Sequence, residues 1–247
     1  MKRLEKYFYG KEEADFYDST INLVVPHYTI MVQVMHDFIS QIFSLNDSLL
    51  IQDIGCGTGI DSIPLLEFYK NATLQAWDLQ KNMQGIFELN ADKKNIGKQR
   101  FNYTILDYRK SSLQENYFNL TISGYCIHHY NLFDKKIFFE RVYENTKPEG
   151  YFILKDLVNY KSPELTKYSH EFDINFIENS FKEMGNNVSP SEKTSLKQLS
   201  ENWVYHMNNE NILDTAEVQM EIMKNIGFRE VECVYKYLQH AIIIAKK

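Results

Sequence analysis

The chain has 247 residues, of which 44% are hydrophobic and 24% are charged, so it is long enough to bury a full core. Its net charge of −6 disfavours nucleic acid as a partner, because proteins that bind phosphate backbones usually carry a basic stripe. No run of 18 apolar residues exists and the segment MKRLEKYFYGKEE has no apolar core, which disfavours a membrane span or a secretory signal and predicts a cytoplasmic protein. The three cysteines lie far apart, which predicts reduced thiols and indicates neither a disulfide framework nor a metal site.

The first half of the chain alternates between two kinds of periodicity. Residues 21–43 show the apolar spacing of a helix after Pro26. From there, short β-like runs alternate with helical segments, which is typical of a parallel sheet with helices on its faces. The predicted strands are 49–54, 73–77, 101–106, 119–125 and 151–158, and the predicted helices between them are about 60–69, 82–95 and 134–145.

The stretch 159–213 interrupts this alternation, because it is polar, rich in Asn and Ser, and helical wherever it is periodic. We interpret it as an inserted helical cap. The chain then returns to a helix that ends at Gly227 and to two strands, 230–237 and 241–247, which predict a β-hairpin. The whole chain, 1–247, is expected to form one α/β domain, built on a Rossmann-like, doubly wound, mostly parallel seven-stranded sheet with an antiparallel last strand.

Residues 50–59, LIQDIGCGTG, are the most informative part of the sequence. Asp53 lies near the end of an apolar predicted strand, and a turn with Gly55, Gly57 and Gly59 follows. Glycine permits positive φ in a tight strand-to-helix turn and lets a ligand approach the backbone. A dinucleotide site would need its third glycine at position 60, which is Ile60 here. The spacing therefore disfavours a pyrophosphate ligand.

An acid follows each of the first three predicted strands: Asp53, Asp78 and Asp107. Because ligands bind outside the carboxyl ends of parallel strands, these acids are expected to converge on one site. Carboxylates only accept hydrogen bonds, so the set suits a ligand with a cationic centre, ribose hydroxyls and an exocyclic amine, as in S-adenosylmethionine. The alternative is structural: Asp53 would cap a helix, and the other two acids would begin loops.

With these motifs, the chain resembles the class I S-adenosylmethionine-dependent methyltransferases from about residue 15 to its carboxyl end. The segment NTKPEGYFILKDL is similar to the family's turn and fifth strand, with Glu149 in place of a glycine. The resemblance implies S-adenosyl-L-methionine as the cofactor, and it implies cofactor-binding roles along the glycine loop, after the next two strands and in the amino-terminal aromatic segment near Asp18. The implied residues are Asp53, Gly55, Cys56, Gly57, Thr58 and Gly59 at the methionine part, Asp78 and Leu79 at the ribose, Asp107 and Tyr108 at the adenine, and Tyr17 and Tyr28 in the closing segment.

His128 and His129 follow the fourth predicted strand, where the family often places a residue near the transferred methyl group. Either histidine could act as a general base, because the pKa of histidine lies near neutrality. Alternatively, neither has a catalytic role, because methyl transfer often needs only the proximity of the two reactants. The cap carries a second group of rings that could line an acceptor pocket or pack the cap onto the sheet. Its members are Tyr168, His170, Trp203, Tyr205 and His206.

The sequence thus predicts methyl transfer to a small-molecule acceptor. Its two ends also resemble the group that contains carboxy-S-adenosylmethionine synthase, which uses an arginine of the cap for its extra carboxylate. The comparable stretch here, EKTSLKQLSENW, has no arginine, and lysine is a poorer partner for a carboxylate. A nicotinamide-dependent oxidoreductase and a non-catalytic cofactor-binding protein remain alternatives, and the oligomeric state stays open, a homodimer included.

Overall fold

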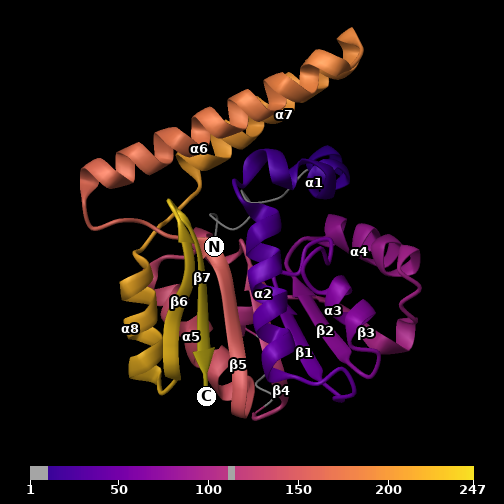
Figure 1. The fold of residues 1–247 in the computed structure, drawn as a ribbon, viewed down its shortest axis with the longest axis vertical. Coiled ribbons are helices and arrows are strands. Elements are labelled where there is room, and N and C mark those ends of the chain that lie inside the picture. Colours follow the sequence, from indigo (N-terminus) through magenta and orange to yellow (C-terminus); the bar gives the residue numbers. More distant parts are fainter. Residues whose placement is uncertain (1–10, 111–114) are drawn as a thin grey trace.

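The structure is a computed structural model that describes residues 11–110 and 115–247 (Figure 1). Its centre is a seven-stranded sheet with the order β3-β2-β1-β4-β5-β7-β6. The strands are β1 (Leu50–Ile54), β2 (Thr73–Asp78), β3 (Phe101–Ile105), β4 (Phe118–Gly124), β5 (Thr146–Leu157), β6 (Arg229–Tyr237) and β7 (His240–Lys246). β1 to β5 pair in parallel, and β7 lies antiparallel between β5 and β6. The predicted mostly parallel, Rossmann-like sheet with an antiparallel last strand is confirmed.

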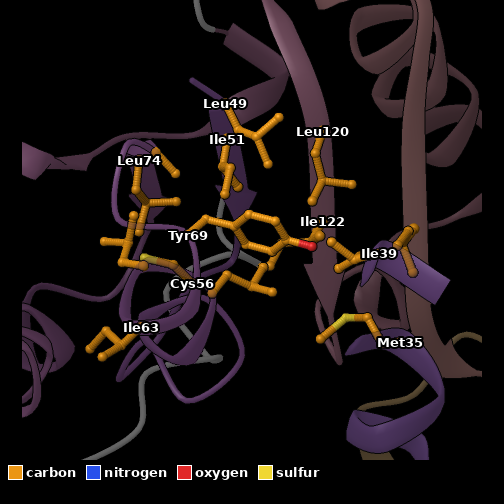
Figure 2. Packing of buried hydrophobic residues seen from close by; sticks show 14 of the residues in the cluster. Met35, Ile39, Leu49, Ile51, Cys56, Ile63, Tyr69, Leu74, Leu120 and Ile122 are labelled. Carbon is orange, nitrogen blue, oxygen red and sulfur yellow. The ribbon is translucent and has the colours of Figure 1, made fainter. Parts of the chain in front are cut away.

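Helices cover both faces of the sheet. The α-helices are α1 (Lys11–Val24), α2 (Tyr28–Ile42), α3 (Ile63–Phe68), α4 (Lys81–Lys93), α5 (Leu132–Asn145), α6 (Pro163–Met184), α7 (Pro190–Asn209) and α8 (Ala216–Ile226). In β7, Ile242 and Ile244 belong to a core with α2, α3 and α4, whereas Ile243 belongs to a core with α5 and α8 (Figure 2 shows the first). Successive strand residues point to opposite faces, so the two cores lie on opposite sides of the sheet.

The amino-terminal part differs from the single helix expected over residues 21–43. The structure has two helices there, because α1 ends at Val24 and α2 begins at Tyr28. Between them, Pro26 cannot donate a helical hydrogen bond, and His27 takes a left-handed backbone with φ of 61°. The break turns α1 away from α2, so that α1 packs on α6 and α4.

The cap between β5 and α8 is a pair of long helices, α6 and α7, that lies across the carboxyl ends of the parallel strands (Figure 1). Both helices begin with a serine cap followed by proline, which favours helix initiation at these positions. Ser162 accepts the Leu165 N–H, and Ser189 forms a capping box with Glu192. The pair packs on α1 through a third apolar core that includes Ile21, Phe181 and Trp203.

The two ends of the cap are joined where they meet the sheet. The Asn159 N–H donates to the Asp214 carbonyl at 2.9 Å, and the Ile212 N–H donates to the His128 carbonyl at 2.7 Å. The fully buried ammonium of Lys135, on α5, donates to the Ile212 carbonyl and to the Asp214 carboxylate, both at 2.6 Å. These hydrogen bonds fix the position at which the chain returns from α7 to the sheet.

Asp53 is an acid in the middle of the sheet. It lies inside β1 and is 2% exposed. Burial raises its pKa to about 8, because a low-dielectric environment penalises the charged form.

Among the described residues, no helix is both long and apolar enough to cross a membrane.

Replacing Lys135 with methionine is expected to lower the free energy of unfolding by about 3 kcal/mol, since it leaves the Asp214 carboxylate and the Ile212 carbonyl without their buried cation. Lys136→Met is the matched control: the Lys136 side chain is 60% exposed, and its pair with Glu140 is long at 3.8 Å, so a change within about 0.5 kcal/mol is expected. Urea denaturation followed by circular dichroism measures both. Equal effects of the two substitutions would contradict the anchoring role of Lys135.

The buried Asp53 carboxyl predicts a pH-dependent stability. An unfolded aspartate has a pKa near 3.9, so between that value and about 8 the folded state holds a proton that the unfolded state has lost. Stability from this group is present at low pH and falls by roughly 1.4 kcal/mol per pH unit across that window. Asp53→Asn removes the titration, so the difference between wild type and variant should change by about 2 kcal/mol from pH 6.0 to 7.5. If denaturation gave the same difference in the free energy of unfolding between wild type and Asp53→Asn at both pH values, the prediction would be contradicted.

Candidate active site

The turn after β1 has a backbone that suits glycine. Gly55, Gly57 and Gly59 have φ of 74°, 51° and 78°. A Cβ atom at Gly55 would lie 2.5 Å from the Cys126 sulfur, and one at Gly59 would lie 2.6 Å from the Ile63 side chain. A Cβ atom at Gly57 would meet no described atom within 4 Å. Packing of the protein itself requires the first and third glycines, whereas the space above Gly57 is open to a ligand.

Asp78 ends β2 and holds this turn in place. Its carboxylate accepts the Gly57 N–H at 2.7 Å and the Gln80 N–H at 2.6 Å. Asp78 is 8% exposed, and burial raises its pKa. A carboxylate offers about four acceptor sites, so this one has capacity for a ligand hydroxyl as well. Leu79 is 38% exposed and presents an apolar surface next to it.

Two of the three predicted acids come together, and the third has a protein partner. The Asp78 charge lies close enough to Asp53 to add to the effect of burial on the Asp53 pKa. Asp107 lies two residues past β3 and forms a two-point ion pair with Arg109, at 2.9 and 3.0 Å. Burial alone would raise the pKa of Asp107, but the Arg109 guanidinium lowers it below its ordinary value. Asp107 is therefore already engaged in this structure.

Two other predicted cofactor residues have their side chains in the core. Tyr108 is 2% exposed, its ring centroid lies 5.4 Å from those of Trp77 and Phe138, and its hydroxyl accepts an Asn145 N–H at 3.1 Å. Cys56 is 5% exposed, and burial raises the pKa of its thiol. Contact between these residues and a ligand would have to come from their backbone.

A polar clamp ties α1 to the glycine turn. The Thr58 hydroxyl donates to one Asp18 oxygen at 2.5 Å, and the Asn90 amide donates to the other at 2.6 Å. The same Asn90 amide donates to the Thr58 carbonyl at 3.1 Å. Asp18 belongs to the segment that the sequence expects above the cofactor, whereas no pattern in α4 points to Asn90. The clamp places α1 directly against the turn.

Lys155 is a buried cation that the sequence reasoning missed. It lies on β5 and is 1% exposed; its ammonium lies 2.5 Å from an Asp61 oxygen and 4.0 Å from the Tyr28 ring centroid. The Tyr28 hydroxyl donates to the same Asp61 oxygen at 3.0 Å. Burial lowers the Lys155 pKa. A lysine inside the otherwise apolar run YFILK is the signal that could have revealed this network, which fixes the start of α2 to the sheet.

A cavity lies between α1, the cap and the ends of the central strands. It is lined by Tyr17, Ile21, Val24, Val25, Tyr125, His128, Leu157, Trp203, His206, Met207 and His240. Of the cap rings singled out in the sequence, Trp203 and His206 line it, whereas Tyr168 and Tyr205 are 58% and 57% exposed. The cavity is mainly apolar and aromatic, with histidines as its main polar groups.

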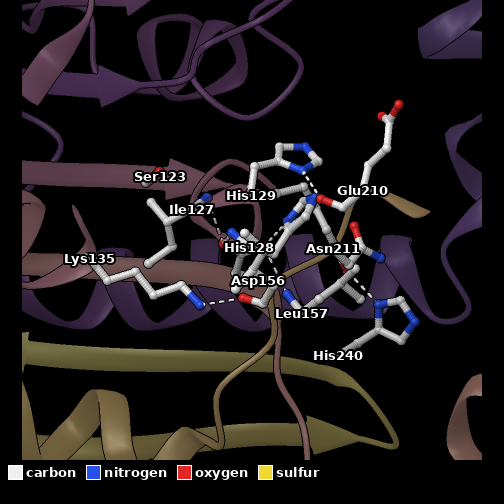
Figure 3. Close-up of polar contacts among 12 residues, drawn as sticks. Ser123, Ile127, His128, His129, Lys135, Asp156, Leu157, Glu210, Asn211 and His240 are labelled. Carbon is white, nitrogen blue, oxygen red and sulfur yellow. Dashed lines mark hydrogen bonds and ion pairs between the residues drawn. The ribbon is translucent and has the colours of Figure 1, made fainter. Parts of the chain in front are cut away.

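The two histidines after β4 lie in different hydrogen-bonding environments (Figure 3). The His128 Nδ1 lies 2.5 Å from an Asp156 oxygen, and the other Asp156 oxygen accepts the backbone N–H groups of Ile127 and His128. The His129 Nδ1 lies 3.1 Å from the Glu210 carbonyl. Burial, with the neighbouring histidines, lowers the His129 pKa to about 2, which disfavours this residue as the general base considered above. His128 is the one of the pair that lines the cavity.

Comparison with known proteins identifies the central part of the chain. Residues 51–150 match the family model of a methyltransferase domain, which spans the glycine turn, Asp78, Asp107 and the two histidines. The carboxy-S-adenosyl-L-methionine synthase of Nautilia profundicola is 24% identical over 247 residues, covering 100% of this chain and 97% of the synthase. The synthase of the same name from Campylobacter lari is 23% identical over 251 residues, with coverage of 100% and 97%.

Solved structures share the fold. A SAM-dependent methyltransferase from Aquifex aeolicus superposes with a TM-score of 0.56 at 14% identity, covering 96% of this chain and 98% of that one. Phosphoethanolamine N-methyltransferase 2 of Haemonchus contortus, in complex with S-adenosyl-L-methionine, gives 0.64 at 15% identity, covering 99% of this chain and 59% of that one. Residues 51–150 therefore match a methyltransferase domain, the whole chain shares its fold with solved S-adenosylmethionine-dependent methyltransferases, and over its full length it is distantly similar to carboxy-S-adenosyl-L-methionine synthases.

Proposed function

We propose that the protein binds S-adenosyl-L-methionine and transfers its methyl group to a small-molecule acceptor. The observation that carries this proposal is the pairing of Gly57 with Asp78: a carboxylate fixed at a strand end beside a glycine with open space above it. A ligand that lies over the turn can place two ribose hydroxyls on this carboxylate and an adenine ring on the exposed Leu79.

In this proposal the acceptor binds at the cavity under the cap, which is small in this structure, about 30 Å³, and has to widen as the acceptor enters. Tyr17 and His128, which line the cavity, come from the two segments that the family resemblance places near the cofactor and the transferred methyl group. α1 is held to the glycine turn by the Asp18 and Thr58 hydrogen bond, so it separates the cofactor and the acceptor from solvent. Exclusion of water and close alignment of the two reactants are what methyl transfer needs most. The aromatic lining suits an acceptor with an apolar or cationic body.

A carboxy-S-adenosyl-L-methionine synthase activity is the second candidate, and the full-length similarity to two such synthases favours it. Such an enzyme holds an additional carboxylate, for which arginine is the best partner. No arginine or lysine lines the described cavity, and residues 159–213 contain no arginine. Methyl transfer therefore remains the proposal.

Asp78→Ala is expected to weaken binding of S-adenosylhomocysteine by roughly 1.5–3 kcal/mol, because two ribose hydroxyls lose a charged acceptor. Asp92→Ala, which removes an exposed acid of α4, is the matched control and should bind like wild type. Isothermal titration calorimetry measures both constants, and circular dichroism confirms that each variant is folded. An unchanged dissociation constant for Asp78→Ala would remove Asp78 from the site.

The two candidate reactions differ in their products. Incubation with methyl-labelled S-adenosyl-L-methionine and a metabolite extract should transfer the label to a small molecule and leave S-adenosylhomocysteine, as read by mass spectrometry. Appearance of a cofactor that is heavier by one carboxylate group would instead establish the synthase activity. Thermal stabilisation by a nicotinamide dinucleotide, with none by S-adenosylhomocysteine, would contradict both.

A further inference from the structure

Three histidine rings from two distant parts of the sequence meet at the side of the cavity. His128 and His129 follow β4, and His206 lies on α7 of the cap. One ring nitrogen from each residue lies within 4.8 Å of those of the other two. The ring centroid of His129 lies 4.0 Å from that of His128 and 5.1 Å from that of His206. Three imidazoles in one partly buried place are a common set of metal ligands.

Each ring is also oriented by an oxygen acceptor on its Nδ1 atom. Asp156 faces His128 at 2.5 Å, the Glu210 carbonyl faces His129 at 3.1 Å, and the Glu210 carboxylate faces His206 at 2.7 Å. An Nδ1 atom that donates to oxygen carries the hydrogen, so in a neutral ring the lone pair lies on Nε2. Histidines that bind metals almost always donate their other N–H to a carboxylate or carbonyl in this way. Figure 3 shows His128 beside Asp156 and His129 beside Glu210.

We propose that His128, His129 and His206 form a binding site for a divalent transition-metal ion such as Zn²⁺. The arrangement is that of a three-histidine site with its fourth coordination position toward the cavity, which His128 and His206 both line.

The ring nitrogens of the three histidines have to move slightly closer together to bind one zinc ion. A zinc ion with nitrogen ligands at about 2.0–2.1 Å in tetrahedral geometry places those nitrogens roughly 3.3 Å apart. Ring nitrogens that lie within 4.8 Å of one another therefore have to approach by up to about 1.5 Å, which ring rotation and a small shift of α7 supply. Binding then joins the cap to the end of β4.

The open position faces the place where the acceptor binds, and this part of the inference rests on the proposed function. Divalent zinc prefers nitrogen, sulfur and oxygen donors, and the protein supplies the nitrogens. An acceptor with a hydroxyl, thiol or amine is thus the ligand class that the fourth position fits. The site would select acceptors that carry such a donor next to an apolar body.

Co²⁺ substitution tests the site directly on the full-length protein. After treatment with a chelator and dialysis, the protein is titrated with Co²⁺, whose visible spectrum reports coordination number and ligand type, and Zn²⁺ is then added as a competitor. One Co²⁺ per chain is expected, with the intense bands of a four- or five-coordinate site that Zn²⁺ abolishes. Binding should also raise the melting temperature, because the ion bridges the cap and the sheet.

Variants separate the site from nonspecific binding. His206→Ala should weaken Co²⁺ binding at least about 100-fold, and Glu210→Ala, which removes the acceptor of the His206 Nδ1–H, should weaken it roughly 10- to 100-fold. His170→Ala, which removes a cap histidine that bonds Asn208 outside the cluster, should bind like wild type. His206→Gln replaces the alanine variant if the latter melts early. The zinc-loaded wild type should show three imidazole ligands by X-ray absorption.

Absence of stoichiometric Co²⁺ binding to wild type would overturn the proposal, and so would equal binding by wild type and the His206 variants. S-adenosylhomocysteine binding, measured on the same samples, separates this result from the proposed function. Intact cofactor binding without metal binding overturns the metal site alone.

Discussion

The hydrogen bond from the Gly57 amide to the Asp78 carboxylate is the constraint on which the rest of the site depends. A buried carboxylate is costly unless it accepts hydrogen bonds, and Asp78 obtains them from the backbone of the turn and from Gln80. In return, the carboxylate holds Gly57 in its positive-φ conformation with open space above it. The same interaction therefore shapes the turn and leaves an anionic group beside that space before any ligand arrives.

Closure of the site follows from a different part of the chain. The Pro26 break frees α1 to pack between the cap and the glycine turn, where Asp18 bonds Thr58 and Asn90. The cap is anchored at its base by Lys135 and shares an apolar core with α1. Through these contacts, α1 and the cap together cover the carboxyl edge of the sheet, although they are far apart in sequence. The cavity lies between them and the strand ends.

The sheet and the glycine turn were predictable from sequence, because strand periodicity and glycine spacing are local signals. Side-chain partners were not, since they depend on where distant elements meet. Asp107 follows its strand as predicted, yet Arg109 occupies it, and the Tyr108 ring fills the core. His206 reaches His129 because the last turns of α7 lie against the segment that follows β4, a contact that helical periodicity within the cap does not reveal.

The most direct measurement is a crystal structure of the protein grown with S-adenosylhomocysteine. We expect the methionine part of the ligand over the turn from Gly55 to Gly59 and both ribose hydroxyls on the Asp78 carboxylate. We also expect the sulfur atom to face the cavity under the cap. A ligand bound elsewhere, or one whose ribose makes no contact with Asp78, would contradict this expectation.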